Sequence, residues 1–144
     1  MILPFELLRL ADTIIDSLDQ DSESHYLTED SLLKLHNVFP DTILLAALDL
    51  IDQRKVTEST TPWGFIEYEV LGSNATHIVY ITLPKALTTS YCTCPAFNFA
   101  VLETGQSLMC KHVLATRLAV RLDLCVKQQI SLDYLATVAS QRYK

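Results

Sequence analysis

Three of the four cysteines of this 144-residue chain lie within one short stretch, YCTCPAFNFAVLETGQSLMCKH, residues 91–112. Cys92 and Cys94 are separated by one residue, and Cys110 and His112 repeat that spacing fifteen residues later. Thiolate sulfurs and imidazole nitrogens are ligands that zinc prefers, and three sulfurs with one nitrogen complete the closed tetrahedral set of a structural site. The stretch therefore predicts one structural zinc ion held by these four residues.

The single-residue spacing indicates which elements carry the ligands. Side chains at i and i+2 of a strand point to the same face, so Cys92 and Cys94 suit the end of a strand. On a helix the same two positions diverge by about 200°. We therefore expect Cys110 at the non-helical cap of a helix and His112 in its first turn. Lys111 and the helix N-terminus would offset the negative charge left by three thiolates on one divalent ion.

Other uses of these cysteines fit less well. Iron–sulfur clusters normally take four thiolates, and a disulfide between Cys92 and Cys94 would close a small strained ring. Isolated buried thiols are common, but clustering with a histidine argues against that interpretation. Cys125 follows His112 by about 20 Å of helix, so we expect a buried free cysteine there. The other histidines have no such companions and are predicted to be ordinary surface or core residues: His25, His36 and His77.

Helical periodicity dominates the N-terminal third of the chain. Apolar side chains recur at helical spacing over residues 4–19. Thr28 predicts the N-cap of a second helix that ends near Val38. A proline then breaks the chain, and Asp41 is predicted to cap a third helix that continues to Ile51.

The pattern changes after residue 54. Residues 55–60, 64–72 and 77–83 are rich in β-branched and aromatic side chains, with turn residues between them, and they predict an antiparallel meander that leads into Cys92. A short helix is expected over 95–102.

A strongly periodic helix is expected from Lys111 to about Cys125, and Ser131 is predicted to cap a last helix that ends at Arg142. The predicted class is α+β, with helices first, then a small sheet, then helices. The length favours one domain, 1–144. Its expected parts are a helical part, 1–53; the meander and zinc finger, 54–125; and a C-terminal helix, 126–144.

Composition indicates an intracellular protein with a permanent partner. Hydrophobic residues make up 49% of the chain and charged residues only 19%, whereas an average soluble domain has about 25% charged residues.

The N-terminus lacks a basic region and reads as an amphipathic helix, and no apolar run approaches the roughly 20 residues of a membrane span. Cysteines without a secretory signal favour a reducing compartment. The predicted partner contacts are aromatic: Phe97, Phe99 and Trp63.

Charge is unevenly distributed along the chain. The net charge is −6, but residues 1–84 carry 14 acidic against 4 basic residues, whereas residues 85–144 carry 7 basic against 3 acidic. The net charge of the whole chain is poorly suited to binding phosphate, since dedicated nucleic-acid domains often have a pI above about 9. Arg117, Arg121 and Lys127 are possible DNA contacts, although a solvated helix face is the simpler interpretation.

The order Cys-x-Cys followed by Cys-x-His resembles the SWIM zinc finger, and the match extends to Ala115, three residues after the histidine. The small side chain of Ala115 is expected to let its helix approach the strand that bears Cys92. Four segments also resemble the small SWIM-domain subunits of Shu complexes: ALDLID (47–52), YEVLGS (68–73), CPAFNFAVL and LMCKHVLA.

This resemblance implies a nuclear protein of homologous recombination. It implies a subunit that works with a RecA-like recombinase paralogue, as an obligate hetero-oligomer, to assemble or protect recombinase filaments on single-stranded DNA. The alternative is a SWIM module that binds DNA directly or mediates other protein–protein interactions. No enzyme is expected, because a four-ligand site has no open position for substrate and the chain lacks the zinc-deaminase and phosphate-loop patterns.

Overall fold

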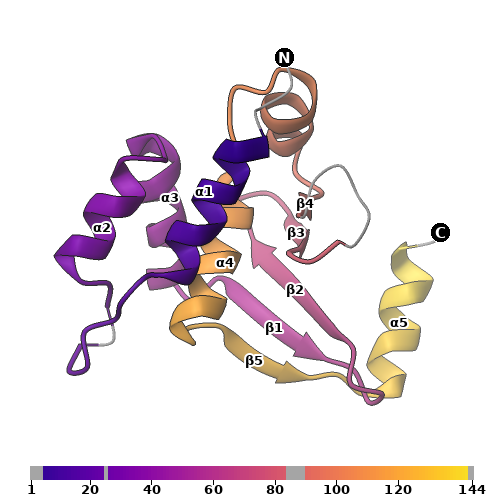
Figure 1. Ribbon diagram of the computed structural model, residues 1–144. Helices are drawn as coiled ribbons and strands as arrows, with labels where there is room; N and C mark the ends of the chain where they lie inside the picture. Colours follow the sequence, from indigo (N-terminus) through magenta and orange to yellow (C-terminus); the bar gives the residue numbers. More distant parts are fainter. Residues whose placement is uncertain (1–4, 25, 84–89, 143–144) are drawn as a thin grey trace.

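The computed structural model describes residues 5–24, 26–83 and 90–142 (Figure 1). Three helices come first: α1 (Phe5–Asp16), α2 (Glu29–His36) and α3 (Asp41–Asp52). Four strands follow: β1 (Val56–Thr60), β2 (Ile66–Leu71), β3 (Thr76–Tyr80) and β4 (Tyr91–Cys92). The chain ends with a π-helix, η1 (Phe97–Glu103), and with α4 (Lys111–Leu122), β5 (Val126–Gln129) and α5 (Leu132–Arg142). The predicted α+β class is confirmed.

The strands form one mixed sheet in the order β4-β3-β2-β1-β5. The predicted meander is present, because β1 to β4 pair antiparallel in sequence order. The sequence prediction missed β5, which pairs parallel to β1 at the edge of the sheet. Its sequence, VKQQ, is short and mostly polar, so it carries no strand pattern of its own. It becomes a strand because α4 crosses over the sheet and returns the chain alongside β1.

Helix α4 is the centre of the molecule. It contacts α1 and α3 on one side and strands of the sheet on the other (Figure 1). A helix covered on both sides must be apolar nearly all round. Its buried residues accordingly occupy most of its length: His112, Val113, Leu114, Ala115, Thr116, Leu118, Ala119 and Leu122.

The helix ends follow local chemistry, with two corrections to the sequence prediction. The Thr28 side chain accepts a hydrogen bond from the Ser31 backbone N–H at 3.2 Å, as expected of an N-cap. Pro40, rather than Asp41, occupies the N-cap position of α3. Helix α4 ends at Leu122 instead of continuing to residue 125, because Asp123 adopts a left-handed conformation with φ of 55°. Asp is one of the few non-glycine residues that tolerate this conformation.

Polar contacts attach α1 and the segment after it to α4. Arg117 of α4 forms an ion pair with Asp12 of α1. Arg121 donates to the Leu18 carbonyl at 3.2 Å, and the Gln20 amide donates to the Leu122 carbonyl at 2.9 Å. These contacts fix α1 across the helix that carries the zinc ligand His112.

Helix α5 lies beside the sheet, away from the helical layer (Figure 1). Its predicted start is correct, because the Ser131 hydroxyl accepts a hydrogen bond from the Tyr134 backbone N–H at 3.1 Å. Leu132 and Tyr134 remain exposed. Within the described ranges, no helix combines the length and the apolar character that a bilayer-spanning segment needs.

Candidate metal centre

The four predicted ligands converge between β4 and the start of α4. Strand β4 ends at Cys92, and Cys94 follows two residues later. Cys110 is the N-cap of α4, and His112 lies in its first turn, as the spacing predicted. One ligand atom from each residue lies within 4.8 Å of the other three, and all four side chains are buried.

This donor set fits a tetrahedral zinc ion. Zinc–sulfur bonds of about 2.3 Å place ligand atoms roughly 3.8 Å apart, which is compatible with the observed cluster. The Nδ1 atom of His112 is buried and has no hydrogen-bond partner among the residues that the structure describes. A zinc ion bound through Nδ1 would satisfy this atom, and buried polar atoms rarely stay unpaired.

The thiols of the cluster hydrogen-bond to one another. Hydrogen bonds from Cys110 and Cys92 hold the pKa of Cys94 far below its usual value. Hydrogen bonds with Cys92 and Cys94, together with burial, raise the pKa of Cys110. Three buried sulfurs this close together disfavour three negative charges, and a bound cation would stabilise three thiolates at neutral pH.

Backbone N–H groups support two of the sulfurs. The Phe97 N–H at the start of η1 donates to Cys94 Sγ at 3.3 Å, and the Val113 N–H in the first turn of α4 donates to Cys110 Sγ at 3.4 Å. Helix N-termini favour negative charge, so both elements stabilise thiolates. Lys111 is exposed at the first position of α4; its role in offsetting the site's charge stays a prediction.

His77 is a neighbour of the site that the sequence prediction placed among ordinary residues. Its ring lies against that of His112, with centroids 4.5 Å apart. Gly72 in the β2–β3 turn leaves room for it, because a Cβ there would lie 3.1 Å from His77 Nε2 and 2.8 Å from the Ala75 carbonyl oxygen. The signal in the sequence was strand alternation. His77 and Val79 share a face of β3, and Val79 pairs with Cys92.

Ala115 is fully buried in α4. It lies one turn beyond His112, on the part of α4 that follows the zinc ligands, and α4 contacts β3 and β4. This position is consistent with the close approach of helix and strand that the sequence suggested.

The predicted partner contacts differ in accessibility. Phe97 is only 1% exposed, and its ring packs edge-on against Tyr91 with centroids 5.4 Å apart. It is therefore a core residue, which corrects its assignment as a partner contact. Phe99 and Trp63 are 57% and 66% exposed, so both remain available.

The predicted DNA contacts are largely engaged within the chain. Arg117 and Arg121 make the contacts with α1 and Leu18 described above. Lys127 on β5 is exposed but pairs with Asp123 at 3.0 Å. Arg117 is thus committed to an ion pair within the chain, whereas Arg121 and Lys127 are exposed, and their contact with DNA stays a prediction.

Cys125 lies outside the metal cluster. It is partly buried between α4 and β5 and packs against the core. Burial, with further contributions from Glu58 and Asp123, raises its pKa to about 12. The prediction of a free cysteine that is not a ligand agrees with this position.

Comparison with known proteins identifies the family. The SWIM zinc finger family matches residues 77–119, a span that contains all four ligands. Zinc finger SWIM domain-containing protein 7 of Danio rerio is 35% identical over 137 residues, which is 94% of either chain. This chain belongs to that SWIM-domain family. The Homo sapiens relative of the same name is 37% identical over 77% of this chain and 74% of its own, and a Dictyostelium discoideum homologue is 33% identical over 74% and 65%. No solved structure matches the chain.

Family membership and geometry agree on the cofactor. The SWIM-domain protein has a Cys3His centre that fits one structural zinc ion, as the spacing predicted.

Proposed function

We propose that this SWIM-domain protein is a non-catalytic, zinc-binding subunit of a Shu-type complex. With a RecA-like recombinase paralogue, it promotes the assembly of recombinase filaments in homologous recombination and DNA repair, in the nucleus. Support comes from similarity to the SWIM-domain relatives along nearly the whole chain and from the segment resemblance to Shu subunits described above.

The closed metal centre is the observation that supports a non-catalytic role for the protein. Four buried side chains converge on one point, whereas catalytic zinc needs an open coordination position for water or substrate. Zinc here would join β4 to α4 and stabilise the fold. The chain's contribution to recombination is then made by its surface.

Exposed apolar side chains support a role in assembly. Trp63 lies in the turn between β1 and β2, and Phe99 lies on η1 beside the zinc centre, both largely exposed. Aromatic residues are enriched in the cores of protein–protein interfaces. An obligate subunit accounts for these exposures better than an isolated monomer does.

Co-expression tests this proposal directly. The chain would be produced alone and with the RecA-like paralogue of its own organism, and the two preparations compared by size-exclusion chromatography and thermal melting. The proposal expects a stable complex with raised melting temperature, and faster recombinase filament formation on single-stranded DNA when the complex is added. A monodisperse, stable monomer whose melting is unchanged by the paralogue contradicts it.

The alternative function is direct DNA binding by this chain. Affinity for nucleic acid comes mainly from phosphate neutralisation and falls steeply with salt. A salt titration of the purified chain with single-stranded DNA separates the two: the proposed function expects weak binding by the chain alone.

A further inference from the structure

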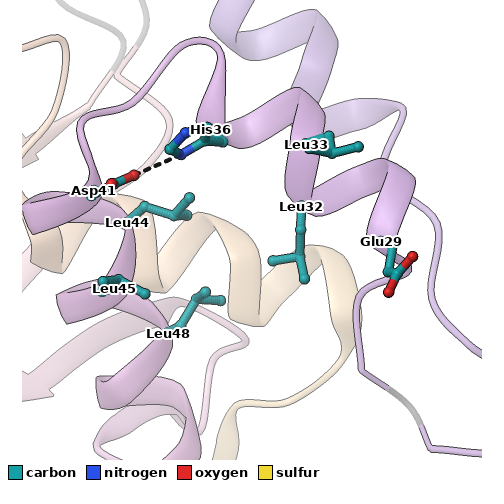
Figure 2. A pocket seen from close by; sticks show the side chains of 8 residues that line it. All are labelled: Glu29, Leu32, Leu33, His36, Asp41, Leu44, Leu45 and Leu48. Atoms are coloured by element: carbon teal, nitrogen blue, oxygen red, sulfur yellow. Dashed lines mark ion pairs between the residues drawn. The ribbon is translucent and has the colours of Figure 1, made fainter.

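An apolar groove lies between α2 and α3 (Figure 2). Its volume is about 450 Å³. The groove is lined mainly by leucines, with polar residues at its ends: Glu29, Leu32, Leu33, His36, Asp41, Leu44, Leu45 and Leu48. Leu33 is 62% exposed and Leu45 is 65% exposed. Large apolar side chains gathered in an open groove mark interaction surfaces.

The lining residues follow helical spacing on both walls. Positions 29, 32, 33 and 36 of α2 lie at i, i+3, i+4 and i+7, and positions 41, 44, 45 and 48 of α3 repeat the pattern. Each helix therefore turns one continuous face toward the groove. Two such faces side by side are the arrangement onto which a third helix packs, with its own apolar side chains between the ridges.

A contact between His36 and Asp41 spans the end of the groove at the α2–α3 connection. His36 Nδ1 lies 2.6 Å from an Asp41 carboxylate oxygen, across the connection between α2 and α3 (Figure 2). Leu44 and Leu48 of α3 and Leu32 of α2 project into the space between the two helices (Figure 2). The groove is thus formed within the chain itself.

A second, smaller hollow continues the groove. Its volume is about 150 Å³, and it shares Leu32 and Leu48 with the first. It extends toward the end of α4 at Leu122 and toward the exposed ring of Tyr26. Together the two hollows form one track lined mainly by apolar side chains.

Apart from His36, which contacts Asp41, the charged side chains that line this track are acidic. Glu29, Asp41 and Asp52 line the two hollows, and the structure describes no lysine or arginine among the lining residues. The nearby Lys34 pairs with Asp30 at 3.3 Å and does not line the groove. The surrounding half of the chain, residues 1–84, carries 14 acidic and 4 basic residues.

We infer that the α2–α3 groove docks an amphipathic helix of a partner protein, with leucine-sized anchors on one face and basic residues at both ends. Helix-in-groove recognition uses anchors at i, i+3 or i+4 and i+7, which is the spacing of both walls. Basic ends complement the carboxylates, and complementary charge raises the association rate and suppresses wrong partners. A second copy of this chain is a poorer occupant, because it would bring the same acidic half to the groove.

This inference deepens the proposed function, on which it rests for the identity of the partner. Exposed leucines on α2 and α3 are then the contact with a helix of the recombinase paralogue. The chemistry of the occupant follows from the groove alone.

A pair of substitutions separates docking from simple charge attraction. Leu33→Asp and Leu45→Asp each remove an exposed anchor and add a negative charge. Binding by charge alone would be unchanged or tighter, whereas docking in the groove would be lost. Leu71→Asp is the matched control, since Leu71 is an exposed leucine on β2, outside the groove.

The probe is a 14-residue helical peptide with leucines at i, i+3 and i+7 and lysines at both ends. A peptide with glutamates in place of the lysines serves as its control. We expect the zinc-loaded wild-type chain and Leu71→Asp to bind the lysine peptide, and Leu33→Asp and Leu45→Asp to bind at least tenfold more weakly. No binding by the wild-type chain, or equal binding by the groove variants, overturns the inference.

The same four proteins co-expressed with the paralogue distinguish the two proposals. Loss of the complex in the groove variants alone supports both. A complex that survives every variant overturns the groove inference and leaves the proposed function standing. Absence of a complex with the wild-type chain, while the lysine peptide still binds in the groove, contradicts the proposed function and leaves the groove inference standing. Unchanged zinc content and circular dichroism in each variant verify the fold.

Discussion

His77 shows how much of the zinc site depends on residues that do not touch the metal. Its ring lies against the ring of His112, and Gly72 gives it the space to do so. Burial is the main cause that lowers the pKa of His77, and the neighbouring His112 adds to it. A partly buried ring against His112 would limit the access of water to a bound metal and restrict how the ligand can turn.

Replacing His77 with alanine therefore loosens the site without removing a ligand. Outer-shell substitutions typically weaken metal binding by roughly 10- to 100-fold. We expect His77→Ala to transfer zinc to a colorimetric chelator at least about tenfold faster than wild type. His36→Ala, which changes a histidine outside the four-residue cluster, is the control. Equal transfer rates in all three proteins would show that His77 has no part in holding zinc.

Ala115 is the residue whose small side chain we expect to let α4 approach the sheet closely. It is completely buried one turn beyond His112. Ala115→Thr adds a branched side chain where no space is left, and overpacking costs about 1–3 kcal/mol. Urea unfolding of the zinc-loaded protein should show a loss in this range, while Ala139→Thr on the exposed side of α5 should change stability little. A fully stable Ala115→Thr protein would disprove close packing at this position.

The thiol of Cys125 should react slowly with alkylating reagents in the folded protein. The thiolate is the reactive form of cysteine, and burial with nearby Glu58 and Asp123 raises the pKa of this thiol to about 12, above its ordinary value of 9.0. At pH 8 the folded protein then holds far less thiolate at Cys125 than an unfolded chain does. Iodoacetamide labelling followed by mass spectrometry should modify Cys125 at least about tenfold more slowly in the folded protein. Equal rates in folded and urea-unfolded protein would contradict this.

At the scale of elements, the end of α4 is set by one backbone conformation. Asp123 is left-handed, and the backbone N–H groups of Asp123 and Leu124 donate to the Val120 and Ala119 carbonyls at 3.3 and 2.8 Å. These are the paired hydrogen bonds of a Schellman cap. The chain is thereby turned out of the helix and into β5.

Glycine should suit this cap better than the native residue does. A side chain in the left-handed region costs about 1 kcal/mol relative to glycine. We expect Asp123→Gly to raise the free energy of unfolding by up to about 1 kcal/mol and Asp123→Ala to lower it. Lys127→Ala corrects for the exposed Asp123–Lys127 pair, which is worth little. If alanine and glycine are equivalent at 123, the cap does not determine where α4 ends.

Elements with a strong local signal could be predicted from the sequence. Apolar residues at helical spacing predicted α1 to α4, and alternating side chains predicted β1 to β3. The Cys-x-Cys and Cys-x-His spacings predicted that the ligands lie at the end of a strand and at the start of a helix. Thr28 and Ser131 were recognised as caps because their side chains act within three residues.

Features created by tertiary contact could not be predicted. The residues of β5 are too polar to give a strand pattern in the sequence. They form a strand because α4 returns the chain alongside β1. Residues 95–102 read as an ordinary helix, whereas the Thr104 N–H bonds to the Phe99 carbonyl in the i→i−5 manner of a π-helix. Arg117 and Arg121 looked like a solvated face, and only the position of α1 shows that they hold it.

At the scale of the whole molecule, zinc would join the two halves of the chain. Cys92 and Cys94 follow the meander, and Cys110 and His112 open the helix around which the other elements pack. Structural zinc contributes about 10–16 kcal/mol in small finger peptides, whereas a typical domain is stable by only roughly 5–15 kcal/mol. Loss of the metal should therefore release α4 from the sheet and lower both helicity and soluble yield.

The measurement that tests this most directly is the zinc-to-chain ratio of the purified protein, determined by elemental analysis. Wild type and Cys125→Ser should each contain one zinc ion per chain. Cys92→Ser and His112→Ala should each contain far less and show reduced helicity by circular dichroism. A wild-type chain that keeps its full stability after complete removal of zinc, or ligand variants that keep one zinc per chain, would contradict the account.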